Sequence, residues 1–339
     1  MHKLLLLAAL TLAASASAQD QVGTTAAPFL GLGVDARGTA MGSAHVAMAD
    51  GAAALYWNPA AAAEVSARAG TGDVLFSNSE WFVNSRHQFF GLALHAGGLG
   101  TFGISVTALD YGEEAVTTIE QPEGTGEFYG ALDLAVGLSY ARHLTDRFAL
   151  GGTVKLVRQQ IWNESANGAA LDLGVQYTTG YRGLTIGMAM TNFGSDMKLS
   201  GRDLRQRIDI APGQEGNNDG LPAELEVNEW RLPLAFRVGV SADAVRAGSQ
   251  RLTVSLEGQA PSDNSQSASA GFEYGYGGLV FLRGGYRQAF SAVAEDGGWT
   301  LGAGLRYDLN DRFGVAIDYV FQEYEPFGTP QMFTLGVTF

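Results

Sequence analysis

Histidine is the side chain that proteins use most often for proton transfer near neutral pH, and the chain has five. His2, His45, His87, His95 and His143 are scattered, without the His-x-x-x-His or His-Glu-x-x-His spacing that brings two ligands to one metal ion. Cys is absent, and no Gly-x-Ser-x-Gly sequence marks a nucleophilic serine. A serine and a histidine on different strands could still form a hydrolase pair, which leaves an enzyme as the least favoured alternative. We therefore expect no enzyme, no cofactor and no metal site.

Acidic residues outnumber basic ones, 35 to 21, which gives a net charge of −14. The basic residues are spread along the chain, so no positive patch for nucleic acid is expected. Two acidic stretches, 113–127 and 215–229, supply the hard oxygen ligands that calcium prefers. Neither contains an Asp-x-Asp-x-Asp loop, so solvated loops are the first expectation and calcium binding is the alternative.

The composition and the N-terminal residues both point away from the cytosol. Only 17% of the residues are charged, against about 25% in soluble domains. A basic start at 1–3, an apolar run at 4–14 and the small residues Ala16, Ser17 and Ala18 predict a signal peptide over 1–18. No later stretch has the roughly 18 apolar residues of a membrane-spanning helix. We expect a periplasmic or secreted protein, or a β-barrel in the outer membrane of a Gram-negative bacterium.

From about residue 68 onward, apolar and small residues alternate with the period of a β-strand. In 102–108 and 132–140, for example, mostly apolar residues fill one face and mostly small residues fill the other. A soluble sandwich would also alternate, but its solvent face would be rich in Lys and Glu. The small face here carries isolated charges that suit a crowded polar lumen, namely Lys155, Asp172, Arg237, Arg283, Arg287, Arg306 and Asp318. The apolar face would then meet lipid.

The lengths of the connections indicate how the strands cross the membrane, because outer-membrane barrels have short periplasmic turns and longer outer loops. The expected outer loops are 81–84, 111–127, 163–168, 195–229, 261–267, 288–298 and 323–331. The expected inner turns between them are 97–100, 144–147, 179–183, 243–250, 275–278 and 310–312. This alternation predicts fourteen antiparallel strands over residues 67–339, with both termini on the periplasmic side.

Residues 19–66 lack the strand pattern and are rich in Ala and Gly. Asp50 is placed to cap a short helix over 51–56, and Asn58 precedes Pro59 as the N-cap of another helical turn. We expect this segment to be stored as a plug in the lumen. The predicted fold is an all-β membrane protein, a transmembrane β-barrel with a short N-terminal plug that contains small helices.

The plug segment carries a signature. Its order is Pro28-Phe29-Leu30, then Asp35, Arg37, Gly38, Met41 and Gly42, then Asp50, and finally Tyr56, Trp57, Asn58, Pro59 and Ala60. This order and spacing resemble the N-terminal signature of the PorV/PorQ proteins, within the wider family of FadL-like barrels, whose plug also carries Asn-Pro-Ala. The resemblance implies an outer-membrane barrel of type IX secretion that associates with a giant SprA-like translocon barrel. Such a barrel receives cargo through the cargo's C-terminal domain and passes it to the attachment complex.

Two further functions stay open beside this PorV-like adaptor. One is a PorQ-like subunit of the attachment complex, and the other is a FadL-like transporter of hydrophobic molecules. A transporter needs a bulky apolar pocket in its lumen, whereas the expected inward faces are mostly small. A bulky residue at Gly137 or Gly187 should therefore harm a transporter and leave an adaptor intact.

Two segments outside the plug are candidates for contacts with other molecules. The longest expected outer loop, 195–229, is acidic towards its C-terminal end and is followed by Trp230. We expect this loop to be the partner-binding surface. The residues concerned are Asp219, Glu224, Glu226, Glu229 and Trp230. The last residue, Phe339, ends an alternating aromatic strand of the kind that outer-membrane insertion machinery receives. The expected partners are thus the translocon, cargo C-terminal domains, attachment-complex proteins and outer-membrane lipids.

Overall fold

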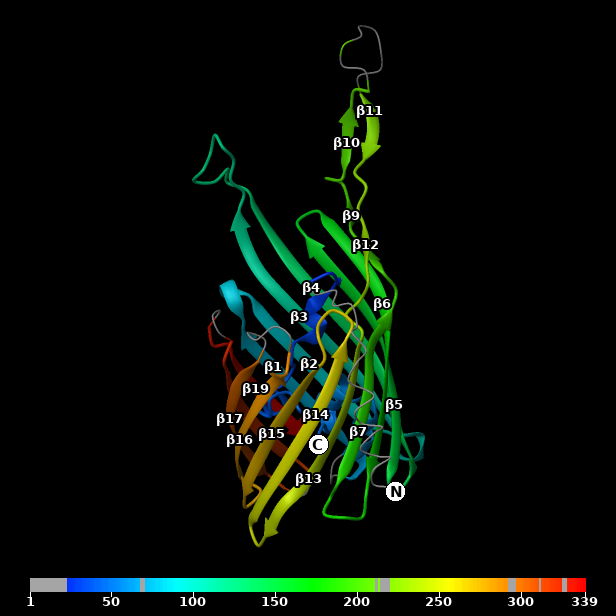
Figure 1. Cartoon of the computed structure of the whole chain (residues 1–339), viewed down its shortest axis with the longest axis vertical. Helices are drawn as coiled ribbons and strands as arrows, with labels where there is room; N and C mark the ends of the chain where they lie inside the picture. Colours follow the sequence, from blue (N-terminus) through cyan, green and yellow to red (C-terminus); the bar gives the residue numbers. More distant parts are fainter. Residues whose placement is uncertain are drawn as a thin grey trace, which may run out of the picture.

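Alternating side chains build a closed barrel of fourteen antiparallel strands in this computed structural model (Figure 1). The structure describes residues 23–67, 71–210, 213, 220–291, 297–310, 312–324 and 328–339, with the main chain only at 66 and 67. The strands of the wall are β1 (Gly72–Glu80), β2 (Arg86–His95), β3 (Thr101–Ala115), β4 (Phe128–Thr145), β5 (Phe148–Ile161), β6 (Glu164–Thr178), β7 (Thr185–Gly194), β13 (Ala235–Ala247), β14 (Gln250–Pro261), β15 (Ser267–Tyr276), β16 (Val280–Ala289), β17 (Gly298–Asp308), β18 (Gly314–Gln322) and β19 (Gln331–Thr338). The predicted fold is confirmed, and the predicted signal peptide lies outside the described residues.

The two longest connections, 116–127 and 195–234, lie at the same end of the barrel, as the sequence predicts (Figure 1). We call its two ends the long-loop end and the short-turn end. Two connections are tighter than expected, because strand pairing continues to Ile161↔Glu164 and to Ala247↔Gln250. The loop expected at 163–168 is therefore a turn at 162–163, and the turn expected at 243–250 is confined to 248–249.

The wall separates an apolar outer face from a small, polar inner face. On β4, Leu132, Val136 and Leu138 are exposed, whereas Asp133 and Ser139 are buried. The outer face is the band that such a barrel presents to lipid. The predicted inward charges are buried or nearly buried at Lys155, Asp172, Arg237, Arg283, Arg287 and Asp318. Within the described ranges, no helix has the length and apolar character to span a bilayer.

The ring closes between the first and last strands, where β1 pairs with β19 over eight residues. Phe339 extends this seam at the short-turn end. Gly72 N donates to Phe339 O at 2.7 Å, and Phe339 N donates to Gly72 O at 2.9 Å. A Cβ at Gly72 would lie 2.7 Å from the Phe339 ring, so the glycine makes room for the terminal aromatic side chain.

Deleting Phe339 is expected to lower the amount of folded barrel, because the seam loses two main-chain hydrogen bonds and its terminal ring. Export across the inner membrane should stay normal, since the N-terminal signal is unchanged. Heat-modifiable migration on gels measures the folded fraction, with Phe339→Ala as the variant that keeps the main chain. Equal amounts of heat-modifiable barrel in the wild type, the deletion and the alanine variant would contradict this role of Phe339.

Five short helical elements occupy the lumen: η2 (Pro28–Gly31), α2 (Ala36–Ala40), η3 (Gly51–Ala53), α3 (Ala54–Trp57) and η4 (Pro59–Ala67). We call residues 28–67 the plug; Figure 1 shows it in blue among the barrel strands. Just before the plug, at the long-loop end, Ala27 N donates to Gln159 Oε1 at 2.8 Å. Towards the short-turn end, Ala52 N donates to Asp73 Oδ1 at 2.7 Å. The described chain thus begins near the end of the barrel opposite Phe339, and the N-terminal residues whose side was predicted lie outside the described residues.

Glycines of the wall let the plug main chain touch the barrel main chain. A Cβ at Gly187 would collide with Val46 O, and one at Gly285 would collide with Gly42 N. A Cβ at Gly137 would instead lie 2.6 Å from the Ser105 hydroxyl, on the neighbouring wall strand β3. A bulky residue at Gly187 would therefore displace the plug main chain.

The connection between β7 and β13 projects beyond the other loops (Figure 1). We call residues 195–234 the arm. It contains β8 (Met197–Lys198), β9 (Ser200–Gly201), β10 (Arg205–Ile208), β11 (Leu221–Glu224) and β12 (Glu229–Trp230). β10 pairs with β11 and β12 with β8, while β9 pairs with the outer end of β6. Much of the segment expected as a loop is thus a narrow two-stranded ribbon.

Candidate functional site: plug and outer mouth

Asp35 joins two helices of the plug. As the N-cap of α2, its Oδ2 accepts a hydrogen bond from Gly38 N at 3.0 Å. Its Oδ1 accepts from Trp57 Nε1 at 2.5 Å, and the residue is buried. A Cβ at Gly38 would lie 2.8 Å from the Trp57 ring, so glycine is needed where α2 meets the indole. These three signature residues form one packed joint.

Arg37 connects the plug to the wall through a chain of charges. Its Nε lies 2.8 Å from Glu273 Oε2, and its Nη1 lies 3.1 Å from Asp50 Oδ2. Arg283 continues the chain at 2.7 Å from Glu273 and 2.5 Å from Asp318. Burial opposes the charge of Arg37, but Glu273 and Asp50 raise its pKa well above the ordinary value. Arg37 thus has a carboxylate partner on each side, which is the condition for burying its charge.

The predicted capping role of Asp50 is not observed. Asp50 stands at the N-cap position of η3, but its side chain makes no capping hydrogen bond. The carboxylate pairs with Arg37 instead, and a hydrogen bond to a charged partner is stronger than one to a main-chain N–H. Asp50 therefore pairs with another residue of the plug rather than capping a helix.

Asn58 is fully buried and ties three main-chain segments together. Its Nδ2 donates to Val46 O at 2.9 Å and to Val175 O of β6 at 3.1 Å. Its Oδ1 accepts from Ala60 N at 3.2 Å, at the start of η4 as the sequence predicts. Pro59 follows at the first position of η4, where a missing N–H is tolerated. The Asn-Pro-Ala sequence thus starts a helix and fastens the plug to the wall.

The aromatic part of the signature packs beneath a wall arginine. The rings of Tyr56 and Trp57 meet edge to face with centroids 5.0 Å apart. Arg237 Cζ lies 5.6 Å from the Tyr56 centroid and 5.3 Å from that of Trp57. His45 meets Trp57 at 5.6 Å, and burial lowers the pKa of His45 to about 4, so the imidazole is neutral near pH 7. Met41 is fully buried as well, and the whole cluster serves packing.

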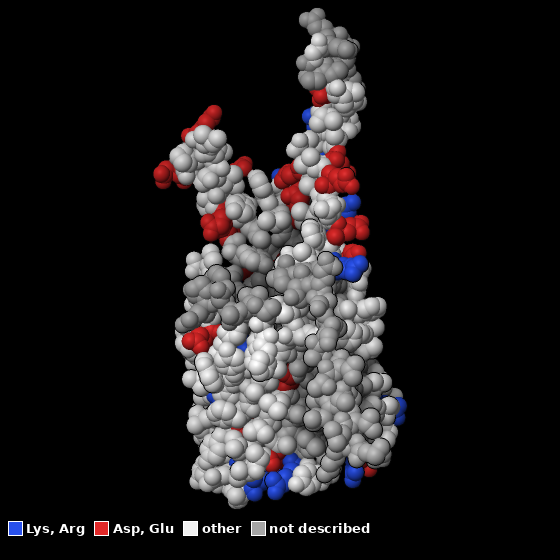
Figure 2. All heavy atoms as spheres, viewed as in Figure 1, with Lys and Arg blue, Asp and Glu red and all other residues white. Residues whose placement is uncertain are grey.

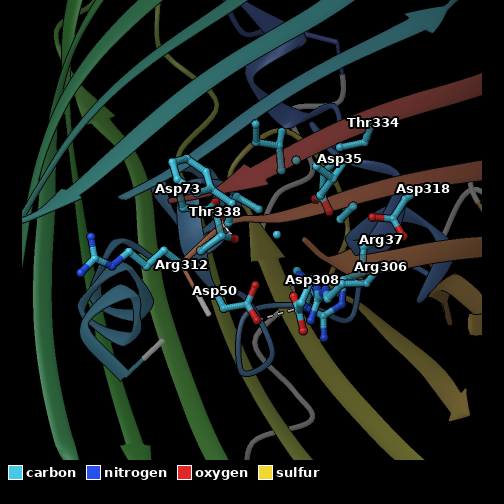
Figure 3. A pocket seen from close by; sticks show the side chains of 18 of the residues that line it. Asp35, Arg37, Asp50, Asp73, Arg306, Asp308, Arg312, Asp318, Thr334 and Thr338 are labelled. Carbon is cyan, nitrogen blue, oxygen red and sulfur yellow. Dashed lines mark hydrogen bonds and ion pairs between the residues drawn. The ribbon is translucent and has the colours of Figure 1, made fainter. Parts of the chain in front are cut away.

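A charged cavity of about 510 Å³ lies beside the plug towards the short-turn end. Figure 3 shows acidic and basic side chains around it, among them Asp35, Arg37, Asp50, Asp73, Arg306, Asp308 and Asp318. Asp73 is bonded within the protein, since its carboxylate accepts from Ala52 N at 2.7 Å and from Thr338 Oγ1 at 3.0 Å. In the part of the chain that the structure describes, no three His, Asp or Glu side chains are grouped to hold a metal ion. Several anchors of the plug line this cavity.

A second cavity, of about 820 Å³, lies at the long-loop end. Its wall comes from the turn between β1 and β2, the outer ends of β3 to β5 and the base of the arm. The large apolar and aromatic residues that line it are Trp81, Phe82, Val83, Tyr111, Tyr129, Ile161, Met197, Leu199, Val227 and Trp230. Residues 23–26, which precede the plug, lie along the same cavity. We call it the outer-mouth cavity.

An aromatic cluster holds the rim of this cavity. Trp81, Phe82 and Tyr324 contact one another with ring centroids 4.9 to 5.5 Å apart. Arg287 Cζ lies 3.3 Å from the Tyr324 centroid. Sequence reasoning missed Trp81 and Phe82 as binding residues. The available signal was the apolar Trp-Phe-Val run in a connection between two strands, where exposure is expected.

The arm residues that were predicted to bind a partner do not lie together in the structure. Trp230 lines the outer-mouth cavity, and Glu229 precedes it on β12. Glu224 lies farther out on β11, and Glu226 is exposed between them. Asp219 lies outside the described residues. Figure 2 shows acidic side chains gathered on the loops of the long-loop end and basic ones near the short-turn end.

The sequence matches the family described as type IX secretion system protein PorV over residues 15–193, more than half of the chain. The chain belongs to the PorV family. Its membership confirms the resemblance that the plug signature predicted. The PorV family and the barrel fold together make the chain an outer-membrane protein of type IX secretion.

Solved structures of other barrels share the fold of this PorV-family chain. The CymD monoaromatic hydrocarbon channel has a TM-score of 0.54 and 12% identity, over 91% of this chain and 98% of that one. The Pseudomonas putida toluene transporter TodX has a TM-score of 0.53 and 14% identity, over 90% and 97%. A Pseudomonas aeruginosa FadL homologue has a TM-score of 0.52 and 12% identity, over 90% and 98%. At these identities the likeness concerns the fold alone. No curated protein matches the chain.

Proposed function

We propose that this barrel is a PorV-like adaptor that binds a SprA-like translocon barrel, receives cargo through its C-terminal domain and carries it to the surface attachment complex. The family match supports service in type IX secretion. The observation that most favours an adaptor is the contact between plug and wall main chains, at Val46 against Gly187 and Gly42 against Gly285. A barrel that handles cargo on its outer surface has no need of an open lumen.

Co-purification tests this proposal. A tag on the full-length barrel, used after mild solubilisation of native membranes, should recover a β-barrel protein several times larger than this chain together with secreted cargo. The matched control is a barrel whose arm is shortened, which should lose these partners and keep its own fold. Recovery of the barrel alone, even after chemical cross-linking in intact cells, would count against the adaptor.

We further propose that the long loops face the cell exterior and that the short turns and Phe339 face the periplasm, as in other outer-membrane barrels. An epitope inserted at residue 213 of the arm should then bind antibody on intact cells. The same epitope in the turn at 146–147 should bind only after the outer membrane is opened. Antibody binding at 146–147 on intact cells would reverse the orientation.

A FadL-like transporter is the second candidate, and the apolar outer-mouth cavity favours it. The fold likeness to a hydrocarbon channel and a toluene transporter is compatible with it. Transport would require the plug to leave its wall contacts, which an adaptor does not need. A PorQ-like subunit is the third candidate, and it would co-purify with attachment-complex proteins rather than with the translocon.

A further inference from the structure

The lining of the outer-mouth cavity discriminates between classes of ligand. The described residues that line it include two acids, Glu114 and Asp133, and no Lys or Arg. Asp133 is already bonded, since it accepts from Tyr111 Oη and Gln159 Nε2, each at 3.0 Å. Glu114 is exposed at the outer end of β3. A fatty acid would bring its carboxylate to these acids without a counter-ion, so the cavity suits an apolar group that is neutral or stands beside a positive charge.

A stretch of main chain already lies in this mouth. Ala26 N donates to Arg231 O, directly after β12, at 2.8 Å. Thr25 Oγ1 donates to Asp263 Oδ2 at 3.0 Å. Thr24 lines a small cavity together with Glu229, Trp230 and Arg231, so residues 24–26 lie close to β12. Residues 24–26 therefore place a stretch of peptide main chain next to the apolar cavity.

The rim presents an apolar side chain at a strained position. Val83 has φ +53°, a left-handed conformation that β-branched residues rarely adopt, and the next residue, Asn84, has φ +59°. Such a conformation is strained, and strained residues cluster at functional sites. The Val83 side chain is 85% exposed, so no buried contact of its own explains the strain. A partner that covers Val83 would explain why the turn holds it there.

We propose that the outer-mouth cavity binds an extended segment of secreted cargo in which a bulky apolar side chain stands next to a Lys or Arg. The apolar side chain enters among Phe82, Tyr129 and Trp230, and the cation faces Glu114. The segment's main chain takes the place of residues 24–26 beside β12. This inference rests on the proposed adaptor function and adds the part of the cargo that the barrel recognises.

Peptide binding to the purified full-length barrel tests the inference, with tryptophan fluorescence as the readout because Trp81 and Trp230 line the site. The probes are nonapeptides of Gly, Ser and Thr that carry either Phe-Lys or Phe-Glu at the centre, and oleate and toluene serve as small-molecule probes. We expect the Phe-Lys peptide to bind about tenfold more tightly than the Phe-Glu peptide. Phe82→Ala should weaken both peptides.

Charge reversal supplies the decisive variants. Glu114→Lys should invert the preference between the two peptides, whereas Glu127→Lys, an exposed acid outside the cavity lining, should leave it unchanged. An unchanged preference in Glu114→Lys would overturn the inference, as would tighter saturation by oleate or toluene than by either peptide.

Secretion assays separate this inference from the proposed function. Normal secretion by Glu114→Lys combined with loss of secretion on shortening the arm would reject the cavity as the cargo site and keep the adaptor. Normal secretion by both variants would reject the cargo site and the adaptor function alike. Reduced secretion by a folded Glu114→Lys barrel would support both the cargo site and the adaptor function.

Discussion

Shortening the arm is expected to abolish delivery of cargo to the cell surface while the barrel still folds. The variant replaces residues 202–226 by a short Gly-Ser linker and keeps β8 and β12 at the base. β10 and β11 pair only with each other among the described strands, so their loss removes no pairing from the wall. It does remove Glu224, Glu226 and the part of the arm that projects farthest (Figure 1). Surface cargo, measured by antibody on intact cells, should fall to background.

The matched control for this variant shortens the other projecting hairpin by replacing residues 117–126, between β3 and β4. This hairpin is also acidic, so it tests whether loss of negative charge alone stops delivery. We expect a smaller loss of surface cargo from the control. Normal delivery by a folded, arm-shortened barrel would show that the arm is not the partner-binding surface.

Arg37→Ala is expected to unseat the plug and leave the wall intact. The change leaves Asp50 and Glu273 without their plug cation, and breaking a buried ion pair from one side costs about 3–5 kcal/mol. The strands close on themselves without help from the plug, so heat-modifiable migration should stay normal. The plug should become sensitive to protease, and the purified barrel should conduct ions in planar bilayers.

Arg312→Ala is the control for this prediction, because Arg312 lines the same charged cavity but is exposed. It should leave both protease resistance and conductance at wild-type values. Arg37→Lys keeps the charge but loses the two-nitrogen contact with Glu273, so an intermediate result is expected. An Arg37→Ala variant with wild-type protease resistance and conductance would show that the chain of charges does not hold the plug.

The wall of this barrel could be predicted from the sequence because successive side chains of a strand point alternately to the lumen and to the outer face. Asp172 and Arg283 stand on small faces of alternating segments, and both are buried in the lumen. The positions of the turns were less certain. The turn at 162–163 places Trp162 at φ +48°, where Gly or Asn would be the usual signal, so the sequence indicated a longer loop.

The candidate site could be predicted only in part, because its contacts join distant segments. The plug signature was recognised, but the partner of Arg37 lies 236 residues away at Glu273. The direct approach of Val46 to Gly187 depends on where the plug main chain runs, which no local pattern encodes. The outer-mouth cavity likewise combines the β1–β2 turn with the base of the arm, and neither segment forms a pocket by itself.

A disulfide that locks the plug tests most directly whether cargo is handled outside a closed lumen. The chain has no Cys, and Ala52 Cβ lies 3.1 Å from the position of a Cβ at Gly91 on β2. This separation is somewhat shorter than the roughly 3.5–4.5 Å of disulfides, so Ala52→Cys with Gly91→Cys should form the bond after a small shift of the plug. The measurement is surface delivery of cargo with and without reductant, and each single cysteine variant serves as a control. A closed-lumen adaptor predicts normal delivery in the oxidised state. Delivery that stops on oxidation and returns on reduction would contradict it, because the plug would then have to move.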